Sequence, residues 1–491
     1  MNLLSDLKRL FPYPNFVHSQ EKILSSVYSG RSVLAIMPTG SGKSLCYQFP
    51  AKAGKNLVLV ISPLIALMQD QEKKALDLGI RAAAIHSGIS GGERSEKYRK
   101  LKEKQYQLLF VTPERFRKKE FRESLAANTV DLLVVDEAHC ISLWGHDFRP
   151  DYSKISEFRK EIGNPNVLAL TATATPSTQE DIVKQLGLTG NCEIIYGGME
   201  RTELAISVDD VFSNEDKNDK ILHLLNTKNG SQIVYFLLIE SLAKFSNFLR
   251  GKKVDHQVYH GDLGKDQRAS SLNRFIKNEN VLMLATPAFG LGIDKPNIRQ
   301  IFNYELPGSI ESYFQEIGRA GRDGQPAEAH LFLRDDDLSI SMEFIKWAYP
   351  EKEFITTFYK MLEENSISLL QEGFSFYREK LSFRNKRDYR VESAYNILER
   401  WGCVMPLTEV LSDENNYAAQ KDFRVTLRKP TDDDFKNENQ KVLFQHQNKK
   451  LLDIYSWAKN ETKCRLGGIY EYFGADYIEC GKCDWCHENQ P

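Results

Sequence analysis

Short apolar runs alternate with polar stretches long enough for helices between residues 30 and 200 of the chain. The runs are rich in Val, Leu and Ile and show no polar alternation, which is typical of strands that are buried on both faces of a parallel sheet. They lie at residues 32–37, 57–62, 108–112, 132–135 and 167–171. Because parallel strands need helical crossovers, this rhythm predicts an α/β fold with helices on both faces of the sheet.

The same alternation of apolar runs and polar stretches resumes after a polar segment at residues 209–220. The later apolar runs lie at residues 231–237, 255–260, 281–285 and 300–303. A chain of 491 residues has room for roughly three domains. We therefore expect two tandem parallel-sheet domains, with their boundary between residues 195 and 215.

After about residue 340 the chain becomes helical in pattern. One helical face collects the apolar residues Val391, Ala394, Tyr395, Leu398 and Trp401, and Gly402 follows as a C-cap. The acidic stretch at residues 432–439 predicts a solvated loop. We expect domains at residues 1–200, 201–340, 341–455 and 456–491.

Charge and terminal composition exclude several classes of protein. The chain has 67 Asp and Glu against 65 Lys and Arg, so any path for DNA or RNA must be a local basic surface. The first residues lack the apolar core of a signal peptide, and no apolar run approaches the length of a membrane span. We expect an intracellular protein, in the cytoplasm of a prokaryote or the nucleus of a eukaryote.

A phosphate-binding loop follows the first predicted strand. Residues 37–44 read Met-Pro-Thr-Gly-Ser-Gly-Lys-Ser, with Met37 where the Walker A pattern usually begins with Gly. The glycines allow backbone N–H groups to close around phosphate, Lys43 reaches the β and γ phosphates, and Ser44 binds Mg²⁺. The predicted nucleotide ligands are Thr39, Gly40, Ser41, Gly42, Lys43 and Ser44. A Gly-rich turn without function is the alternative.

An acidic pair ends another predicted strand, at Asp136 and Glu137 in the sequence Leu-Leu-Val-Val-Asp-Glu-Ala-His. Asp136 would hold Mg²⁺ through water, and Glu137 would polarise the attacking water. A strand that merely ends in a capping Asp is the alternative. The two motifs together, on alternating strands, predict an ATP-hydrolysing site more specifically than either does alone.

These residues resemble the DEAH-type superfamily 2 helicases. The run at residues 136–152, Asp-Glu-Ala-His-Cys-Ile-Ser-Leu-Trp-Gly-His-Asp-Phe-Arg-Pro-Asp-Tyr, narrows the resemblance to the RecQ family of DNA helicases. Similar motifs lie at residues 61–71, 109–115, 170–174, 259–263, 285–296 and 313–324. The resemblance implies two RecA-like domains, 3′ to 5′ movement on single-stranded DNA, and a role in DNA repair or recombination.

The resemblance also implies that ATP lies between the two domains. Arg322 would then be an arginine finger on the γ-phosphate, with Arg319 and Gln315 as its companions. Gly290 and Asp294 are further expected contacts of the nucleotide. The alternative for residues 318–322, Gly-Arg-Ala-Gly-Arg, is a surface turn with two solvated arginines.

Residues 11–20 resemble the adenine-recognition element of the family. Gln20 would read the adenine edge in a bidentate manner, and Tyr13 would stack on the ring. The sequence departs from the family pattern at Val17, where relatives have Arg, and at His18 and Ser19, where they have Pro-Gly.

An aromatic-rich loop follows the acidic pair and contains Trp144, Phe148 and Arg149. Aromatic faces with a guanidinium suit stacking on unpaired bases. The resemblance implies that this loop couples single-strand binding to ATP hydrolysis. Packing of the two aromatic rings against their own domain is the alternative.

Four cysteines crowd the end of the chain, at Cys464, Cys480, Cys483 and Cys486. In a reducing compartment this crowding predicts a metal site, and four thiolates satisfy tetrahedral Zn²⁺. The cluster resembles the RecQ zinc-binding module. His487 is an alternative ligand, and an iron–sulfur cluster or free thiols are the other interpretations.

Residues 341–460 fit the family pattern less well, because the zinc cysteines come late. The helix expected at 391–401 resembles the core of a winged helix, and nearby basic residues are candidates for phosphate contacts: Lys380, Arg384, Lys386, Arg387 and Arg390. A solvated helix face explains these residues equally well.

The preferred interpretation is an ATP- and Mg²⁺-dependent DNA helicase with a structural Zn²⁺. Its expected partner is single-stranded and duplex-junction DNA, with no membrane, and we expect a monomer. One alternative is an RNA-directed or strand-annealing ATPase. Another is a DNA-binding adaptor that has lost hydrolysis.

Overall fold

The computed structural model describes residues 2–38, 40–142, 149–197, 200–225, 230–287, 289, 295–381, 388–405, 407, 423–437 and 440–489. The chain forms two compact units. One consists of residues 1–334 and 454–491, and the other of residues 335–453.

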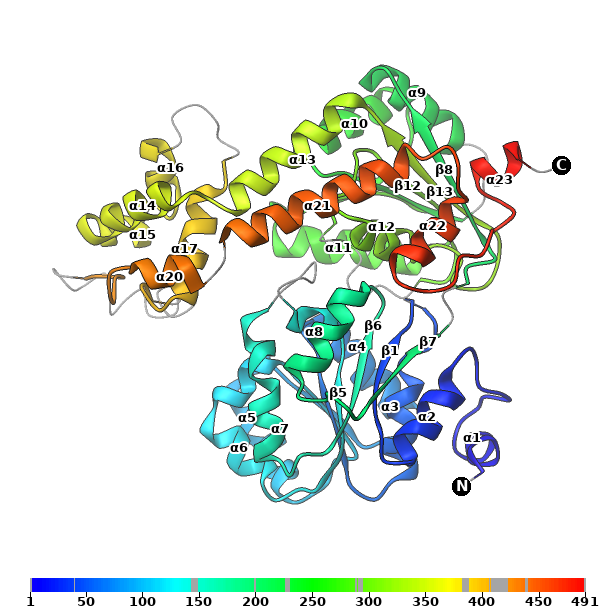
Figure 1. Cartoon of the computed structure of the whole chain (residues 1–491), viewed down its shortest axis with the longest axis vertical. Helices are drawn as coiled ribbons and strands as arrows, with labels where there is room; N and C mark the ends of the chain where they lie inside the picture. The colour runs from blue at the N-terminus through cyan, green and yellow to red at the C-terminus, as the bar shows by residue number, and fades with distance from the viewer. Residues whose placement is uncertain are drawn as a thin grey trace. The chain divides into compact units, whose positions relative to one another are not determined.

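The first unit begins with a parallel sheet of seven strands in the order β3-β4-β2-β5-β6-β1-β7 (Figure 1). The strands are β1 (Ser32–Ile36), β2 (Leu57–Ile61), β3 (Ala82–Ile85), β4 (Leu108–Val111), β5 (Val130–Val135), β6 (Asn166–Thr171) and β7 (Cys192–Tyr196). All five strands predicted in this region are confirmed. The sequence analysis missed β3, which is short and alanine-rich, and β7, a partly exposed edge strand with a Glu in its sequence.

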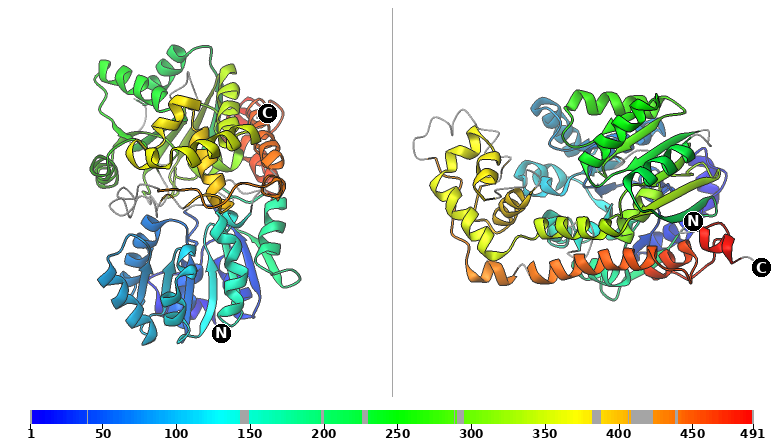
Figure 2. Two further views of the ribbon diagram at one scale, coloured as in Figure 1. Left: turned by 90° about the vertical axis from the view of Figure 1, so that its left-hand side faces the viewer. Right: turned by 90° about the horizontal axis from the view of Figure 1, so that it is seen from above.

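Helices cover both faces of this first sheet (Figure 2). They are α1 (Leu3–Leu10), α2 (Gln20–Tyr28), α3 (Leu45–Ala53), α4 (Ile65–Asp77), α5 (Gly91–Lys102), α6 (Lys119–Leu125), α7 (Ile155–Glu161) and α8 (Pro176–Gln185), with short 3-10 turns at Pro113–Arg117, Ala138–Ile141 and Pro150–Lys154. The central strands β1 and β2 are buried along their whole length, which explains their unbroken apolar sequences.

A second parallel sheet has six strands in the order β10-β11-β9-β12-β13-β8. The strands are β8 (Leu204–Asp210), β9 (Ser231–Tyr235), β10 (Gln257–Tyr259), β11 (Leu282–Ala285), β12 (Ile298–Asn303) and β13 (Ala327–Leu333). Their helices are α9 (Asn214–Leu225), α10 (Ile239–Gly251), α11 (Lys265–Lys277) and α12 (Ile310–Ile317). The polar segment at 209–220 covers the end of β8 and the start of α9, so the chain changes sheets before it, after β7.

The C-terminal residues 454–491 belong to the same unit as the two sheets. They contain α22 (Arg465–Tyr472) and α23 (Asp484–Glu488), and both helices contact β8. The ring of Trp457 packs at a tilt of 49° against that of Tyr313 of α12, with ring centroids 5.0 Å apart. The end of the chain therefore packs on the second sheet domain.

The second unit is helical in its described residues, as expected for the region after 340. Its elements are α13 (Asp335–Ala348), α14 (Lys352–Glu364), α15 (Ser366–Gln371), α16 (Ser375–Leu381), α17 (Arg390–Arg400), α20 (Asp432–Asn437) and the first part of α21 (Gln440–Ala458). An apolar core joins α14, α16 and α17 through Phe358, Tyr377 and Tyr395. An isolated antiparallel bridge pairs Val404 with Thr426.

Two local predictions for the second unit have different outcomes. The helix α17 ends at Arg400 with Trp401 as its C-cap, and Gly402 follows with φ of 67°; the predicted helix end is confirmed, but the cap is one residue earlier than predicted. The prediction of a loop at 432–439 is wrong, because residues 432–437 form α20. The Asp434 N–H donates to Thr431 Oγ1 (3.4 Å), as in an N-cap, and acidic side chains are favourable in the first turn of a helix.

None of the helices in the described part of the chain is both long and apolar enough to cross a membrane.

Candidate active site and metal centre

The phosphate loop connects β1 to α3. Gly40 and Gly42 adopt φ values of 84° and 79°, a region that favours glycine. A Cβ atom on Gly42 would lie 2.5 Å from Gln20 Nε2, so a side chain there would also clash. The sequence folds this way because only glycine tolerates both the turn and the close approach of its neighbours.

The C-terminal end of this loop, which carries Lys43, faces a cavity of about 860 Å³. Lys43 and Ser44 line the cavity, and Ser44 precedes the first turn of α3, whose N–H groups favour an anion. Ser41 is buried and donates its hydroxyl to the Pro38 carbonyl at 2.7 Å, which braces the loop. The predicted phosphate ligands in the described part of the loop thus lie together.

Asp136 and Glu137 come directly after β5 and line the same cavity. Burial, and then the neighbouring Glu137 carboxylate, raise the pKa of Asp136 to about 6. Lys43 opposes that shift, which places its charge close to the carboxylate. Ser62 Oγ donates to Asp136 Oδ2 at 3.5 Å. This arrangement supplies a carboxylate and the Ser44 hydroxyl, the oxygen ligands that Mg²⁺ prefers.

Glu137 is buried and has φ of 48°, a left-handed conformation that is uncommon outside glycine. Its Oε2 atom lies 3.4 Å from Nδ1 of His139, and the same ring nitrogen lies 2.9 Å from Thr171 Oγ1 at the end of β6. Strained backbone of this kind is concentrated at functional sites. His139 and Thr171 were not singled out from the sequence, although both lie in the quoted motifs.

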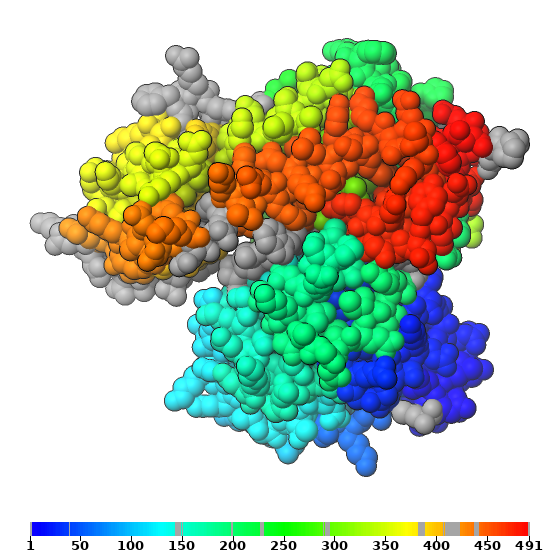
Figure 3. Space-filling view, viewed as in Figure 1, coloured from blue at the N-terminus to red at the C-terminus, as the bar shows by residue number. Residues whose placement is uncertain are grey.

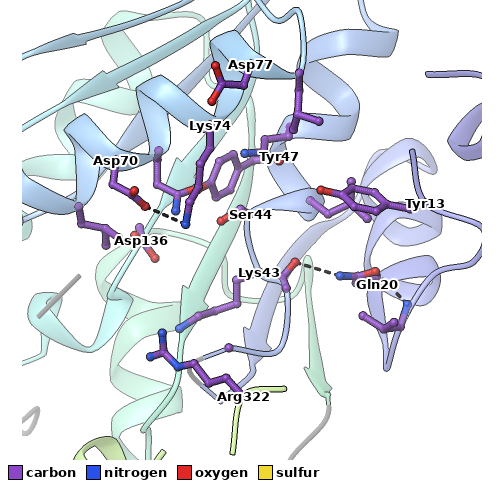
Figure 4. Close-up of a pocket in the computed structure, with 18 of the residues that line it drawn as sticks. Tyr13, Gln20, Lys43, Ser44, Tyr47, Asp70, Lys74, Asp77, Asp136 and Arg322 are labelled. Atoms are coloured by element: carbon purple, nitrogen blue, oxygen red, sulfur yellow. Dashed lines mark hydrogen bonds and ion pairs between the residues drawn. The ribbon is translucent and has the colours of Figure 1, made fainter. Parts of the chain in front are cut away.

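The second sheet domain contributes three side chains to the same cavity. Gln315 of α12 lines it, together with Arg319 and Arg322 from the turn that follows α12. Figure 4 shows the side chains of Lys43 and Arg322 extending the same way, with their nitrogen-bearing ends next to each other in this view. A Cβ atom on Gly40 would lie 3.1 Å from Arg322 Cγ, so the phosphate loop and the arginine are in close proximity. The alternative that these residues form a surface turn with two solvated arginines is excluded, because Arg319 is only 4% exposed.

The two residues expected at the adenine end also line the cavity (Figure 4). Tyr13 is 40% exposed, which leaves its ring accessible. Gln20 accepts from the Val17 N–H at 2.9 Å and donates to the Gly42 carbonyl at 2.9 Å. A primary amide has a second N–H and a second lone pair. Gln20 can therefore still make one donor and one acceptor contact with a base.

Several lining residues of the cavity were not found from the sequence. Tyr47 of α3 donates its hydroxyl to Gln71 Oε1 at 3.0 Å, and Lys74 pairs with Asp70 at 2.9 Å on α4 (Figure 4). Gln71 ends the quoted run at 61–71, so the motif pointed to this helix. Asp70 belongs to the same run, whereas Lys74 lies outside it and carries no such signal, because its spacing from Asp70 is that of any helical ion pair.

Other predicted site residues lie outside the described residues: Thr39, Trp144, Phe148, Gly290, Asp294, Arg384, Lys386 and Arg387. Arg149 is described, and its Nη1 atom donates to the Pro63 carbonyl at 3.1 Å. Arg390 forms a bidentate pair with Asp388, and Lys380 Nζ lies 4.1 Å from the centre of the Phe376 ring. These three cations thus have protein partners in this structure.

The four C-terminal cysteines form a compact cluster whose sulfur atoms all lie within 4.8 Å of one another. The Sγ atoms of Cys464 and Cys483 are 3.8 Å apart, and those of Cys480 and Cys486 are 4.0 Å apart. Tetrahedral Zn²⁺ with Zn–S bonds of about 2.3 Å requires sulfur separations of about 3.8 Å, so the cluster fits the metal. His487 is exposed and does not belong to the cluster.

Backbone N–H groups complete this metal centre. Gly467 and Cys480 donate to the sulfur of Cys464, at 3.4 and 3.2 Å, and Arg465 donates to the sulfur of Cys483 at 3.4 Å. Such contacts stabilise thiolates, the form that binds metal. Cys464 is also the N-cap of α22 and Cys483 that of α23, so the metal ligands determine where both helices begin.

Three family models match this chain. The DEAD/DEAH box helicase model matches residues 18–182, the helicase conserved C-terminal domain matches residues 216–324, and the RecQ zinc-binding model matches residues 421–487. The first two cover the two parallel sheets, and the third contains the cysteine cluster. ATP and zinc as ligands of this chain are therefore confirmed.

The curated relatives are DNA helicases. The chain is 36% identical over 364 residues to the probable ATP-dependent DNA helicase RecS of Bacillus subtilis, covering 74% of this chain and 73% of that protein. It is 40% identical over 351 residues to the ATP-dependent DNA helicase RecQ of the same organism, covering 71% of this chain and 58% of that protein. The matched region thus spans little more than half the length of that RecQ.

Solved helicase structures share the fold at low sequence identity. Dbp5 of S. cerevisiae, bound to RNA and ADP BeF3, gives a TM-score of 0.55 at 18% identity and covers 70% of this chain and 90% of that one. Lhr of Mycobacterium smegmatis, bound to single-stranded DNA and AMP-PNP, gives 0.54 at 19% identity and covers 81% of this chain and 57% of that one. The expectation of two RecA-like domains is confirmed, and with the identities above the chain belongs to the RecQ family of ATP-dependent DNA helicases.

Proposed function

We propose that this protein uses ATP hydrolysis to move 3′ to 5′ along single-stranded DNA and to unwind duplexes at junctions. The observation that supports it is the cavity lined by charged residues of both RecA-like domains, with Lys43, Asp136 and Glu137 on one side and Arg319 and Arg322 on the other. Such a site is complete only when the two domains are together. Hydrolysis and release of product then allow them to separate.

Each side chain has a distinct part in this proposal. Lys43 holds the β and γ phosphates, and Ser44 and Asp136 would hold Mg²⁺, which would neutralise phosphate charge. Glu137 accepts a proton from the attacking water, while His139 keeps its carboxylate in place. Arg322 and Arg319 stabilise the negative charge that grows on the γ-phosphate, and Gln315 contacts the same group.

The nucleotide base lies at the other end of the cavity. Tyr13 stacks on the adenine ring, and Gln20 offers its free N–H and lone pair to the adenine edge. Thr39, Gly290 and Asp294 complete the nucleotide contacts. Trp144, Phe148 and Arg149 bind unpaired bases and report their presence to Glu137, which lies a few residues upstream in the chain.

We further propose that residues 376–450 form a winged helix that contacts DNA phosphates. The helices α14 to α17 around one apolar core, followed by the bridge between Val404 and Thr426, support this assignment. The protein would act inside the cell, where its DNA substrate lies, and as a monomer.

The deciding experiment compares nucleic acids as activators of the purified protein. ATPase activity should rise with single-stranded DNA and much less with RNA of the same length, and a duplex with a 3′ overhang should be unwound in preference to one with a 5′ overhang. Equal stimulation by RNA would favour an RNA-directed ATPase. Absence of hydrolysis with every activator would favour a DNA-binding adaptor.

A further inference from the structure

Arg201 lies where the zinc-binding residues meet the turn that carries the two arginines, residues 318–322. Its side chain is 7% exposed. The guanidinium donates to the carbonyl oxygens of Gly318 at 3.4 Å and of Ala320 at 2.5 Å. These two carbonyls belong to the residues on either side of Arg319, so Arg201 holds the backbone from which Arg319 extends.

Glu203 also packs against the turn at residues 318–322. Its carboxylate pairs with Arg201 Nε, and its backbone carbonyl accepts from the Ala327 N–H at 2.9 Å. A Cβ atom on Gly321 would lie 2.7 Å from Glu203 Cγ. Gly321 also has φ of 66°, so the turn is closed tightly against Glu203 and has little freedom to shift.

The backbone at Arg201 and Thr202 is hydrogen-bonded to the zinc-binding residues. The Arg201 N–H donates to the hydroxyl of Tyr470 on α22 at 2.9 Å, and Lys482 donates to the Thr202 carbonyl. Tyr470 is buried, and burial raises the pKa of its hydroxyl, which is therefore neutral at physiological pH. Because Cys464 caps α22, the position of Tyr470 depends on the metal ligands.

The same residues also contact the first RecA-like domain. Gln179 of α8 donates to the Phe473 carbonyl at 3.2 Å, and a Cβ atom on Gly474 would lie 2.9 Å from Pro176. Figure 3 shows these C-terminal residues, in red, against α8, in teal. On the other side, the Phe473 ring lies 5.4 Å from that of Phe314 in α12. The zinc-binding residues thus touch both domains that form the ATP cavity.

We propose that Arg201 is a positioning residue that transmits the position of the zinc-binding residues to Arg319. The path runs from α22 through Tyr470 to Arg201, and from there to the carbonyls of Gly318 and Ala320. A shift in the position of the C-terminal residues then moves Arg319 in the ATP site. This inference rests on the proposed function of Arg319 at the γ-phosphate.

Arg201→Gln tests the proposal, because glutamine keeps hydrogen-bonding capacity but cannot span both carbonyls. Misplacement of a reacting group by about 1 Å can cost on the order of 10²-fold in rate. We expect kcat for ATP with saturating single-stranded DNA to fall on that order, with KM for ATP little changed. Zinc content by elemental analysis and the thermal midpoint report on folding. Arg201→Lys, which retains the charge and reaches one carbonyl, should recover part of kcat.

The matched control is Arg159→Gln. Arg159 is also buried and donates to a backbone carbonyl, that of Pro165, at 2.8 Å, and it does not line the ATP cavity. Its replacement should lower the thermal midpoint without changing kcat. Equal kcat in Arg201→Gln and the wild type, in folded protein with full zinc content, overturns the proposal.

Two further variants keep the proposal falsifiable if Arg201→Gln folds poorly. Tyr470→Phe removes only the acceptor of the Arg201 N–H, and it should lower kcat while leaving zinc content and KM unchanged. In an Arg319→Ala background, Arg201→Gln and Tyr470→Phe should not lower the single-turnover rate of ATP hydrolysis any further, because both act through Arg319. Additive losses would contradict the path.

The proposed function can fail separately. If Arg322→Ala and Arg319→Ala both keep wild-type hydrolysis, the assignment of the ATP site is wrong, and the inference falls with it. If those variants lose hydrolysis while the folded Arg201→Gln and Tyr470→Phe proteins keep it, only the inference is wrong.

Discussion

Buried carboxylates beside the ATP cavity hold their protons to higher pH than exposed ones. Desolvation raises the pKa of Asp136 to about 6 and that of Glu316, on α12, to about 7. Glu316 accepts from Asn303 Nδ2 at 2.5 Å, and the nearby Arg319 charge partly offsets its burial. At the scale of single residues, the fold therefore tolerates unfavourable burial of acids where charged chemistry is expected.

Glu316 should make stability depend on pH. Its pKa rises from an ordinary value of 4.5 to about 7, so the native state binds more protons between these values. The favourable contribution of Glu316 to the free energy of unfolding is fully present below about pH 4.5. It is lost as pH rises through 7, and the loss is at most about 3 kcal/mol. Glu316→Gln should remove this loss. Denaturant unfolding of both proteins at pH 5 and pH 8 measures it, and an identical difference at both pH values would contradict it.

Lys43 is the residue of the phosphate loop that we propose holds the β and γ phosphates. Lys43→Ala should lower ATP turnover by about 10³-fold, the usual scale for losing one charge-stabilising group. Glu137→Gln should instead retain bound ATP, because it removes the base and leaves the phosphate contacts. Binding of single-stranded DNA serves as the control and should survive both changes. Near-normal turnover in Lys43→Ala would show that the ATP site lies elsewhere.

At the scale of elements, the site residues of the first sheet lie at the carboxyl ends of its strands. The phosphate loop follows β1, Asp136 follows β5, and Thr171 ends β6, and these three strands are adjacent in the sheet. Their carboxyl ends meet at one edge, where ligands bind in parallel α/β sheets. The C-terminal residues bury Leu466, Ile469 and Phe473, and the metal would join the two segments that carry the cysteines.

Zinc binding should supply most of the folding free energy of the C-terminal element. Structural zinc sites are worth roughly 10–16 kcal/mol in comparable peptides. Cys483→Ser should release the metal and make residues after about 454 sensitive to protease, while nucleotide binding by the first RecA-like domain persists. Cys192→Ser is the matched control, since Cys192 lies outside the cluster. Unchanged zinc content in Cys483→Ser would remove the assignment of this ligand.

At the scale of the whole molecule, one compact unit brings together residues separated by more than 250 positions. Arg201 and Tyr470 are 269 residues apart, and Gln179 and Phe473 are 294 apart, yet each pair is hydrogen-bonded. The ATP cavity likewise combines both RecA-like domains. Binding at one domain can therefore change the geometry of a site that the other domain completes.

Coupling between DNA and ATP should depend on the aromatic-rich loop. Trp144→Ala should leave basal ATPase unchanged and weaken its stimulation by single-stranded DNA, because base stacking is worth about 1–3 kcal/mol per base. ATPase rates over a DNA titration measure both effects. Wild-type stimulation in this variant would indicate that Trp144 packs against its own domain.

The sequence by itself determined the features whose information is local. Spacing within a few residues predicts five strands of the first sheet, the phosphate loop, the acidic pair after β5, the end of α17 before Gly402 and the four clustered cysteines. Short-range patterns carry these features because the backbone geometry of a strand, a turn or a metal loop is decided by its own residues.

Only the tertiary structure decided which distant residues meet. The edge strand β7, the contact of His139 with Thr171 and the hydrogen bonds from Arg201 to the residues beside Arg319 had no signal in the local pattern. Arg201 is one arginine among 65 Lys and Arg, and nothing near it in the chain shows that it faces Gly318, Ala320 and Tyr470. Those neighbours come from other segments of the chain, and long-range packing sets their positions.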